Sequence, residues 1–150
     1  MAYITTADLE SRLGSTLYAR LTDRVSGTTA DETVAGGIVA QAEALADSYL
    51  ARRYATPVDL ATHPELAEVL RARVLDVAEY LAWRDSPFVT DVPERVRLVH
   101  GDAEGWFVGL AAGEVELPAL RPPASRTAVD DSPRYVAEPR KFTADELDGL

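Results

Sequence analysis

Residues 46–58, with the sequence ADSYLARRYATPV, place two tyrosines and two adjacent arginines at the end of a helical pattern. Guanidinium groups bind phosphates and aromatic rings stack on bases, so Arg52, Arg53, Tyr49 and Tyr54 could together bind nucleic acid. The same residue types are enriched at the hot spots of protein–protein interfaces. The residue types therefore predict a binding segment and leave the class of its partner open.

The charge of the chain weighs against nucleic acid. The 150 residues carry a formal net charge of −10, and Lys141 is the only lysine. Nucleic-acid binders usually present a basic stripe to the phosphates, whereas an acidic protein repels them. The predominance of arginine suits fixed pairing with carboxylates, although GC-rich codon usage would give the same bias.

Few residues could carry out catalysis. His63 and His100 are the only histidines, there is no cysteine, and neither histidine belongs to a metal-ligand motif. His100 is expected on the polar side of its helix. A Gly-rich phosphate loop, a nucleophile elbow and a His-Glu-x-x-His motif are all missing from the sequence. We therefore expect no catalytic residue and no cofactor, and a protein that is not an enzyme.

Carboxylates are numerous, but their spacing does not bring them together. Two pairs are expected on solvated helix faces: Asp31 with Glu32, and Glu43 with Asp47. Residues 23–32 have the approximate length of a calcium loop, but Val25 and Thr28 stand where further carboxylates would be needed. The sequence therefore predicts no metal site.

Helical spacing of apolar residues defines the elements that position these side chains. Four segments are predicted to be helical: residues 5–13, 30–54, a third opening at 62–65, and a fourth from about 91–94 to Gly113. A short turn or helix is expected over residues 15–24, and a short strand is possible over 114–117. Thr29 and Thr62 have capping-box spacing to the glutamates three residues on, and Gly14 is expected to end the first helix. Every long element is thus predicted to be helical.

Two further patterns concern packing. Gly101, Gly105 and Gly109 lie four residues apart, which predicts that another backbone approaches closely there, a packed protein helix rather than a membrane partner. In residues 46–58, Tyr54 is expected to pack with Leu50, while Arg52 and Arg53 point outward beside Asp47 and Glu43. The arginines are then either solvated or part of an interface, and composition does not separate the two.

The composition changes after residue 117. Residues 118–150 contain five of the nine prolines and too few clustered apolar residues for a core of their own. We predict a helical domain over residues 1–117 and an extended arm over residues 118–150. Near the end of the arm, Phe142 and Leu147 flank a capping-box spacing, which is typical of a peptide that docks on a partner. The alternative is a tail that folds back on its own domain.

Four stretches taken in order resemble a known family: YITTADLESRLG, LTDR, ADSYLARRYATPV and WFVGLAAGEVELP. Together they resemble the small head–tail connector (adaptor) proteins of Mu-like tailed bacteriophages, and of related prophages and gene transfer particles. The resemblance covers roughly residues 3–117, and PRKFTADELDGL resembles the family's ending. Residues 25–32 depart from the acidic, glycine-rich loop of many relatives, so no ion-binding role is carried over.

The resemblance implies an all-α fold, a small antiparallel bundle of about four helices with an extended C-terminal arm. It implies a structural virion protein at the head–tail junction, made in the host cytoplasm. Such adaptors form a ring, usually dodecameric, beneath the portal protein; a stopper or tail-completion protein assembles on them, and DNA passes through the middle. We expect Tyr49, Arg52, Arg53, Phe142 and Leu147 to supply interface contacts, with Glu65, Glu68 or Asp76 of a neighbouring copy facing the arginines.

Two other classes stay open at this stage. A small helical DNA-binding protein, either a regulator or a packaging-recognition subunit, would also use short helices and an arginine pair. A toxin–antitoxin or chaperone-like partner would fit the acidity and the arm. No apolar run approaches the ~20 residues that span a bilayer, and the start resembles no signal peptide, so no membrane partner is expected.

Overall fold

Two short helices open the chain, α1 (Thr6–Leu13) and α2 (Ser15–Thr22). In the computed structural model, which describes residues 2–120, Thr5 and Asp8 form a reciprocal capping box at the start of α1. Gly14 ends α1 with φ of 80°, a backbone conformation that glycine adopts without steric cost. The predicted end of the first helix is confirmed, and the predicted turn or helix after it is a complete helix.

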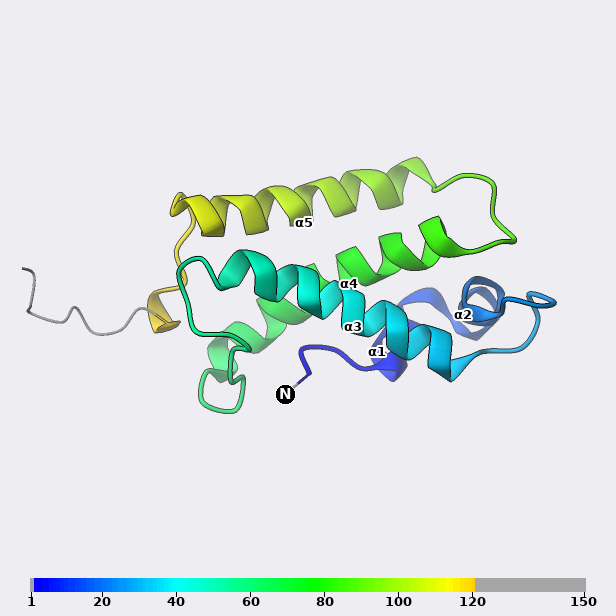
Figure 1. The fold of residues 1–150 in the computed structure, drawn as a ribbon, viewed down its shortest axis with the longest axis horizontal. Coiled ribbons are helices and arrows are strands. Elements are labelled where there is room, and N and C mark those ends of the chain that lie inside the picture. The colour runs from blue at the N-terminus through cyan, green and yellow to red at the C-terminus, as the bar shows by residue number, and fades with distance from the viewer. Residues whose placement is uncertain (1, 121–150) are drawn as a thin grey trace, which may run out of the picture.

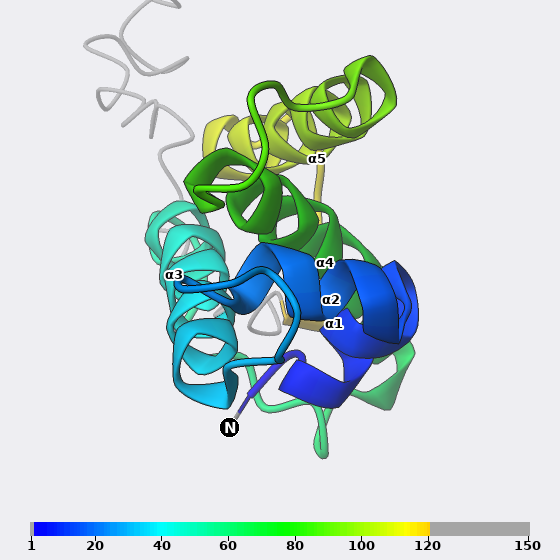
Figure 2. The same cartoon turned by 90° about the vertical axis from the view of Figure 1, so that its right-hand side faces the viewer.

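Three longer helices follow: α3 (Glu32–Leu50), α4 (Pro64–Asp85) and α5 (Glu94–Ala112). These three helices run in alternating directions along the long axis of the view (Figure 1). Seen from one end, α4 is central, with α5 on one side, the α1–α2 pair on another and α3 beside them (Figure 2). The predicted all-α helical bundle is confirmed, with five α-helices in the described residues instead of about four.

Aromatic and aliphatic side chains from all five helices meet around α4. The largest fully buried ones include Tyr18, Leu50, Leu70, Phe107 and Leu110. The Tyr49 ring of α3 stacks on the Phe107 ring of α5, with centroids 6.1 Å apart. Burial of side chains of this size stabilises a fold by roughly 1.5–3 kcal/mol each. The apolar spacing that predicted the helices therefore also predicted their buried faces.

Both predicted threonine caps are wrong. Asp31 caps α3 instead of Thr29, since its carboxylate accepts hydrogen bonds from the backbone N–H groups of Thr33 and Val34. His63 is the N-cap residue of α4 and makes no side-chain cap hydrogen bond. The Thr62 hydroxyl donates instead to Asp59, 2.8 Å away. In both places a nearby aspartate offers the hydroxyl or the N–H group a competing partner.

The ends of α3 and α5 also differ from expectation. α3 ends at Leu50, four residues earlier than predicted, and residues 51–54 form turns. The predicted strand over residues 114–117 does not form. Gly113 adopts the left-handed conformation with φ of 85°, and the N–H groups of Glu114 and Val115 both donate to the Gly109 carbonyl. The chain therefore wraps around the end of α5.

The glycine row of α5 does not hold another helix of the same chain. A Cβ on Gly109 would lie 3.1 Å from Val115, so this glycine does permit a close contact. At Gly101 and Gly105 a Cβ would meet no atom within 4 Å. Within residues 2–120 no other helix supplies the predicted close contact at these two positions.

The described part of the chain ends in a short 3₁₀ helix, η1 (Pro118–Leu120). The predicted arm therefore lies outside the described residues from residue 121 onward, and so do its anchors Phe142 and Leu147. Within residues 2–120, no helix combines the length and the apolar character that crossing a bilayer requires.

Candidate functional site

The segment around Arg53 forms a clasp with the chain that follows α5. The Arg53 guanidinium lies against Gly113, where a Cβ would come within 2.7 Å of it, and it pairs with Glu116 at 3.5 Å. The next residue, Tyr54, accepts a hydrogen bond from the Leu117 N–H at 3.0 Å. We call these five residues the Arg53 clasp. It joins the loop after α3 to the point from which the C-terminal segment continues.

The clasp joins parts of two stretches that carry the family resemblance, ADSYLARRYATPV and WFVGLAAGEVELP, which lie about sixty residues apart in sequence. In the structure they are in direct contact. Gly113 fits this place for two reasons, because its φ is positive and because a Cβ there would force the Arg53 guanidinium to shift. The arginine–tyrosine pattern at residues 53–54 thus has an intramolecular function.

The three candidate residues that lie in the described part of the chain take different positions. Tyr49 is half-buried against Phe107, and Arg53 turns toward the clasp and not toward Glu43 and Asp47. Arg52 is exposed. Both arginines are therefore exposed as expected, but Arg53 is held at the clasp.

Glu43 and Asp47 were predicted to lie on a solvated helix face, but both are half-buried and hold the start of the chain. A Glu43 carboxylate oxygen accepts the backbone N–H groups of Tyr3 and Ile4, and the Tyr3 hydroxyl donates to Asp47. The same hydroxyl accepts the Val58 N–H at 2.8 Å. Burial and the hydrogen bond to Asp47 raise the pKa of Tyr3 above its ordinary value. Residue spacing does not predict these contacts, because Glu43 and Asp47 lie 40 and 44 residues from Tyr3.

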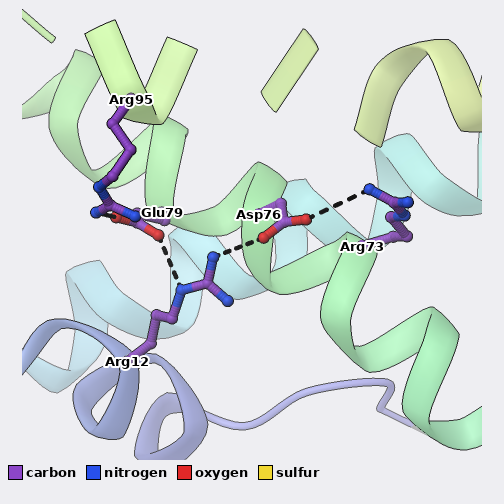
Figure 3. A network of polar contacts seen from close by, with 5 residues as sticks. All are labelled: Arg12, Arg73, Asp76, Glu79 and Arg95. Carbon is purple, nitrogen blue, oxygen red and sulfur yellow. Dashed lines mark hydrogen bonds and ion pairs between the residues drawn. The ribbon is translucent and has the colours of Figure 1, made fainter. Parts of the chain in front are cut away.

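Two carboxylates on α4 are buried and bound by arginines (Figure 3). Asp76 and Glu79 are 8% and 3% exposed. Arg12 of α1 reaches between them, 2.6 Å from Asp76 and 3.0 Å from Glu79. Despite the burial of the guanidinium, these bonds raise the pKa of Arg12. The network therefore fixes α1 onto the middle of α4.

Two further arginines complete this network. Arg95 of α5 pairs with Glu79 at 2.9 Å, and Arg73 lies 3.8 Å from Asp76 (Figure 3). We expected Asp76 to face an arginine of a neighbouring copy, but it is buried and paired within its own chain. The sequence contains a signal for this burial. One helical row of α4 holds Val69, Asp76, Glu79 and Trp83, and an acid beside apolar residues in one row indicates a buried carboxylate.

The Asp23 carboxylate closes the loop between α2 and α3. It accepts hydrogen bonds from the Ser26 hydroxyl and from the backbone N–H groups of Val25, Thr28 and Thr29. These bonds hold the pKa of Asp23 well below its ordinary range. Both of its oxygens are therefore engaged in folding the loop. Within residues 2–120 no three His, Asp or Glu side chains gather in an arrangement that could hold a metal ion.

His100 was predicted to lie on the polar side of its helix, but it packs against an aromatic ring. Its imidazole stacks on the Tyr80 ring of α4, with centroids 3.9 Å apart. Burial lowers the pKa of His100 below its ordinary value of 6.5 because it disfavours the charged imidazolium, and nearby Arg84 acts in the same direction. His100 is thus a packing residue between α4 and α5.

This lowered pKa makes the stability of the protein depend on pH. The unfolded chain takes up a proton at His100 more readily than the folded one, so the stabilisation is complete above pH 6.5 and is lost as the pH falls through the folded pKa. Between pH 7.5 and 5.5, the free energy of unfolding should fall more in the wild type than in His100→Phe, which keeps the ring stack. Urea titrations at both pH values measure it. His63 is present in both proteins, and equal losses would contradict the prediction.

The fold and these sites can be compared with known proteins. The sequence profile of one protein family matches residues 3–132, which is most of the chain, and its description names bacteriophage Mu. The chain is therefore of the class of bacteriophage proteins, consistent with a structural or assembly protein. It belongs to the family described as Bacteriophage Mu, Gp36. A comparison with curated proteins gave no match.

Proposed function

We propose that the protein is a head–tail adaptor, a ring-forming virion protein that docks beneath the portal of the filled head. The stopper or tail-completion protein would assemble on its free side. The family membership supports this proposal at the level of a phage protein. The observation that carries it further is the Arg53 clasp, because it gives the C-terminal segment a fixed point of departure from a rigid bundle.

A fixed departure point matters for a tethered segment. A segment anchored to a folded body is held near its partner, which raises its effective concentration there. Residues 121–141 could extend over about 70 Å at ~3.3 Å per residue, long enough to reach the portal or a neighbouring copy. Phe142 and Leu147 then supply the apolar contacts at the end of that reach.

The charge of the chain suits a ring through which DNA passes. Twelve copies at −10 each would carry −120. An acidic bore repels the phosphate backbone, so DNA would slide through it without binding. Salt-sensitive binding of the purified protein to duplex DNA at physiological ionic strength would favour the rival DNA-binding function instead.

Removal of residues 121–150 tests the proposed docking. The described bundle lies within residues 2–120, so the truncated protein should keep its helical circular dichroism and its cooperative unfolding. It should lose at least ten-fold in binding to purified portal rings, measured by co-sedimentation. The full-length chain is the control. Unchanged binding by a folded truncation would reject the role of the C-terminal segment.

Arg52 and Arg53 form a matched pair for testing the interface. Arg52→Glu changes an exposed side chain and should alter the free energy of unfolding by no more than about 0.5 kcal/mol. If Arg52 lies in the ring interface, this variant should still weaken ring assembly on the portal. Arg53→Glu places a second acid beside Glu116 and should destabilise the clasp as well. Negative-stain microscopy counts the rings, and normal ring yields for Arg52→Glu would exclude that residue from the interface.

A further inference from the structure

A groove at one end of the bundle combines apolar walls with a single arginine. Two hollows of about 340 and 400 Å³ meet there, and Leu17 and Arg20 of α2 line both of them. Volumes of this size are typical of ligand sites. We call this surface the α2 groove and define it by Leu13, Leu17, Arg20, Trp83, Phe88 and Val89.

Arg20 gives the groove a positive charge that the described chain does not neutralise. Within residues 2–120, no carboxylate lies within ion-pair distance of its guanidinium. Asp91 is the one acid among the described residues that line the two hollows, and it is already paired with Arg97. Nearby Arg84 is neutralised by both oxygens of Asp85. The groove therefore favours a ligand that is both apolar and acidic.

The Trp83 indole adds an unsatisfied donor to the same groove. Its N–H is buried and has no hydrogen-bond acceptor within residues 2–120, whereas a buried tryptophan N–H usually has one. The loop over residues 89–91 borders the groove on one side and a further cavity of about 130 Å³ on the other. This loop therefore has room to move away from the indole, and a carbonyl or carboxylate in the groove could then accept the N–H.

The C-terminal segment has the composition that the α2 groove favours. Phe142 and Leu147 lie five residues apart, with Asp145 and Glu146 between them. This order of apolar, acidic and apolar residues matches the arrangement of the groove, in which Arg20 is shared by two hollows. The segment and the groove are thus complementary in charge and in the spacing of their apolar parts.

The segment is long enough to reach the groove of its own chain. The groove lies at the α2 end of the bundle, and η1 lies at the opposite end (Figure 1). The 22 residues of α4 cover roughly 33 Å between these ends at ~1.5 Å per residue. Residues 121–141 extend up to about 70 Å at ~3.3 Å per residue. In dilute protein, a segment tethered to the same chain has a higher effective concentration than that of another copy.

We propose that residues 142–150 dock in the α2 groove of their own chain before the protein assembles. Phe142 and Leu147 would each fill one hollow, and the acids between them would pair with Arg20. The groove would then compete with the portal for the same segment, so that portal docking releases it. This last step rests on the proposed adaptor function.

Cysteine cross-linking tests the docking, since the chain has no cysteine of its own. Thr16→Cys beside the groove is combined with Ala144→Cys in one full-length chain and treated with a short bis-maleimide at low protein concentration. Mass spectrometry should show at least five-fold more cross-link within the chain than in the control, Val108→Cys with Ala144→Cys. Val108 is 48% exposed on α5, the helix from which the C-terminal segment continues, so random encounters favour the control.

Two results of this experiment would overturn the proposal. Equal yields at the two positions would mean that the segment does not select the groove. Covalent dimers in place of cross-links within one chain would mean that the occupant is another copy.

Charge reversal tests the pairing with Arg20. Arg20→Glu should reduce the cross-link in the groove at least five-fold without changing the helical circular dichroism, because the side chain is exposed. Adding Asp145→Arg and Glu146→Arg should restore the yield. Arg52→Glu changes another exposed arginine and should have no effect on the cross-link. An undiminished yield in Arg20→Glu, or no recovery in the triple variant, would overturn the proposal.

Portal binding is measured separately on the same proteins. A specific cross-link in the groove without any portal binding would reject only the adaptor function. Portal binding by a chain that shows equal cross-links at both positions would reject only the docking in the groove.

Discussion

Replacing Arg12 with methionine should lower the free energy of unfolding by about 3 kcal/mol. The substitution keeps an unbranched side chain over α4 but removes the guanidinium that binds both Asp76 and Glu79. Arg73 and Arg95 remain and are partly solvated, so we expect the lower end of the range for breaking a buried ion pair. Urea denaturation followed by circular dichroism at pH 7 measures the change.

The triple variant Arg12→Met, Asp76→Asn, Glu79→Gln shows where the loss comes from. If the loss reflects two carboxylates left without their main partner, neutralising them should restore most of the stability. Arg71→Ala, which removes an exposed pair with Glu68, is the control and should change the free energy of unfolding by less than about 0.5 kcal/mol. A single variant as stable as the wild type would mean that the network in Figure 3 contributes nothing to the fold.

Tyr3→Phe removes one oxygen atom and should destabilise the protein by about 2 kcal/mol. The aromatic ring stays in the core, but the Val58 N–H loses its hydrogen-bond acceptor and Asp47 loses a donor. An unsatisfied buried N–H group is expensive because no water replaces the lost partner. Chemical denaturation gives the free energy, and hydrogen exchange at the Val58 amide reports the local effect.

Tyr54→Phe is a matched control for the Tyr3 prediction. It also removes a hydroxyl that accepts a backbone N–H, here that of Leu117, but at a half-buried site. Tyr54→Phe should therefore lower the free energy of unfolding by less than Tyr3→Phe does. Equal effects of the two variants would show that burial of the Tyr3 hydroxyl does not add to its contribution.

Local signals in the sequence predicted much of the helical architecture. The end of α1 at Gly14 and the end of α5 at Gly113 follow from glycine's freedom to adopt positive φ. The caps at Thr29 and Thr62 were wrong because an aspartate near each motif binds the threonine instead. Asp23 accepts the Thr29 N–H, and Asp59 accepts the hydrogen of the Thr62 hydroxyl. Such competition depends on the path of the loop in space, which spacing alone does not specify.

The contacts of the candidate sites were harder to predict, since they join residues far apart in the chain. Arg53 was expected to point outward from a continuing helix, but α3 ends at Leu50 and the turn directs Arg53 to Gly113. The pairing of Tyr3 with Asp47 and of Arg12 with Glu79 likewise depends on how the helices pack. A residue pattern identifies the chemical groups that can form contacts, and the packing of the helices determines which groups meet.

The Arg53 clasp also determines how mechanical load would enter the bundle. Beyond the packed Leu120, tension on the C-terminal segment reaches Leu117, whose N–H is bonded to Tyr54, and Glu116, which is paired with Arg53. The force is therefore shared between the last turn of α5 and the loop after α3. Peeling α5 away from its C-terminal end requires both contacts to break, which raises the force that the junction withstands.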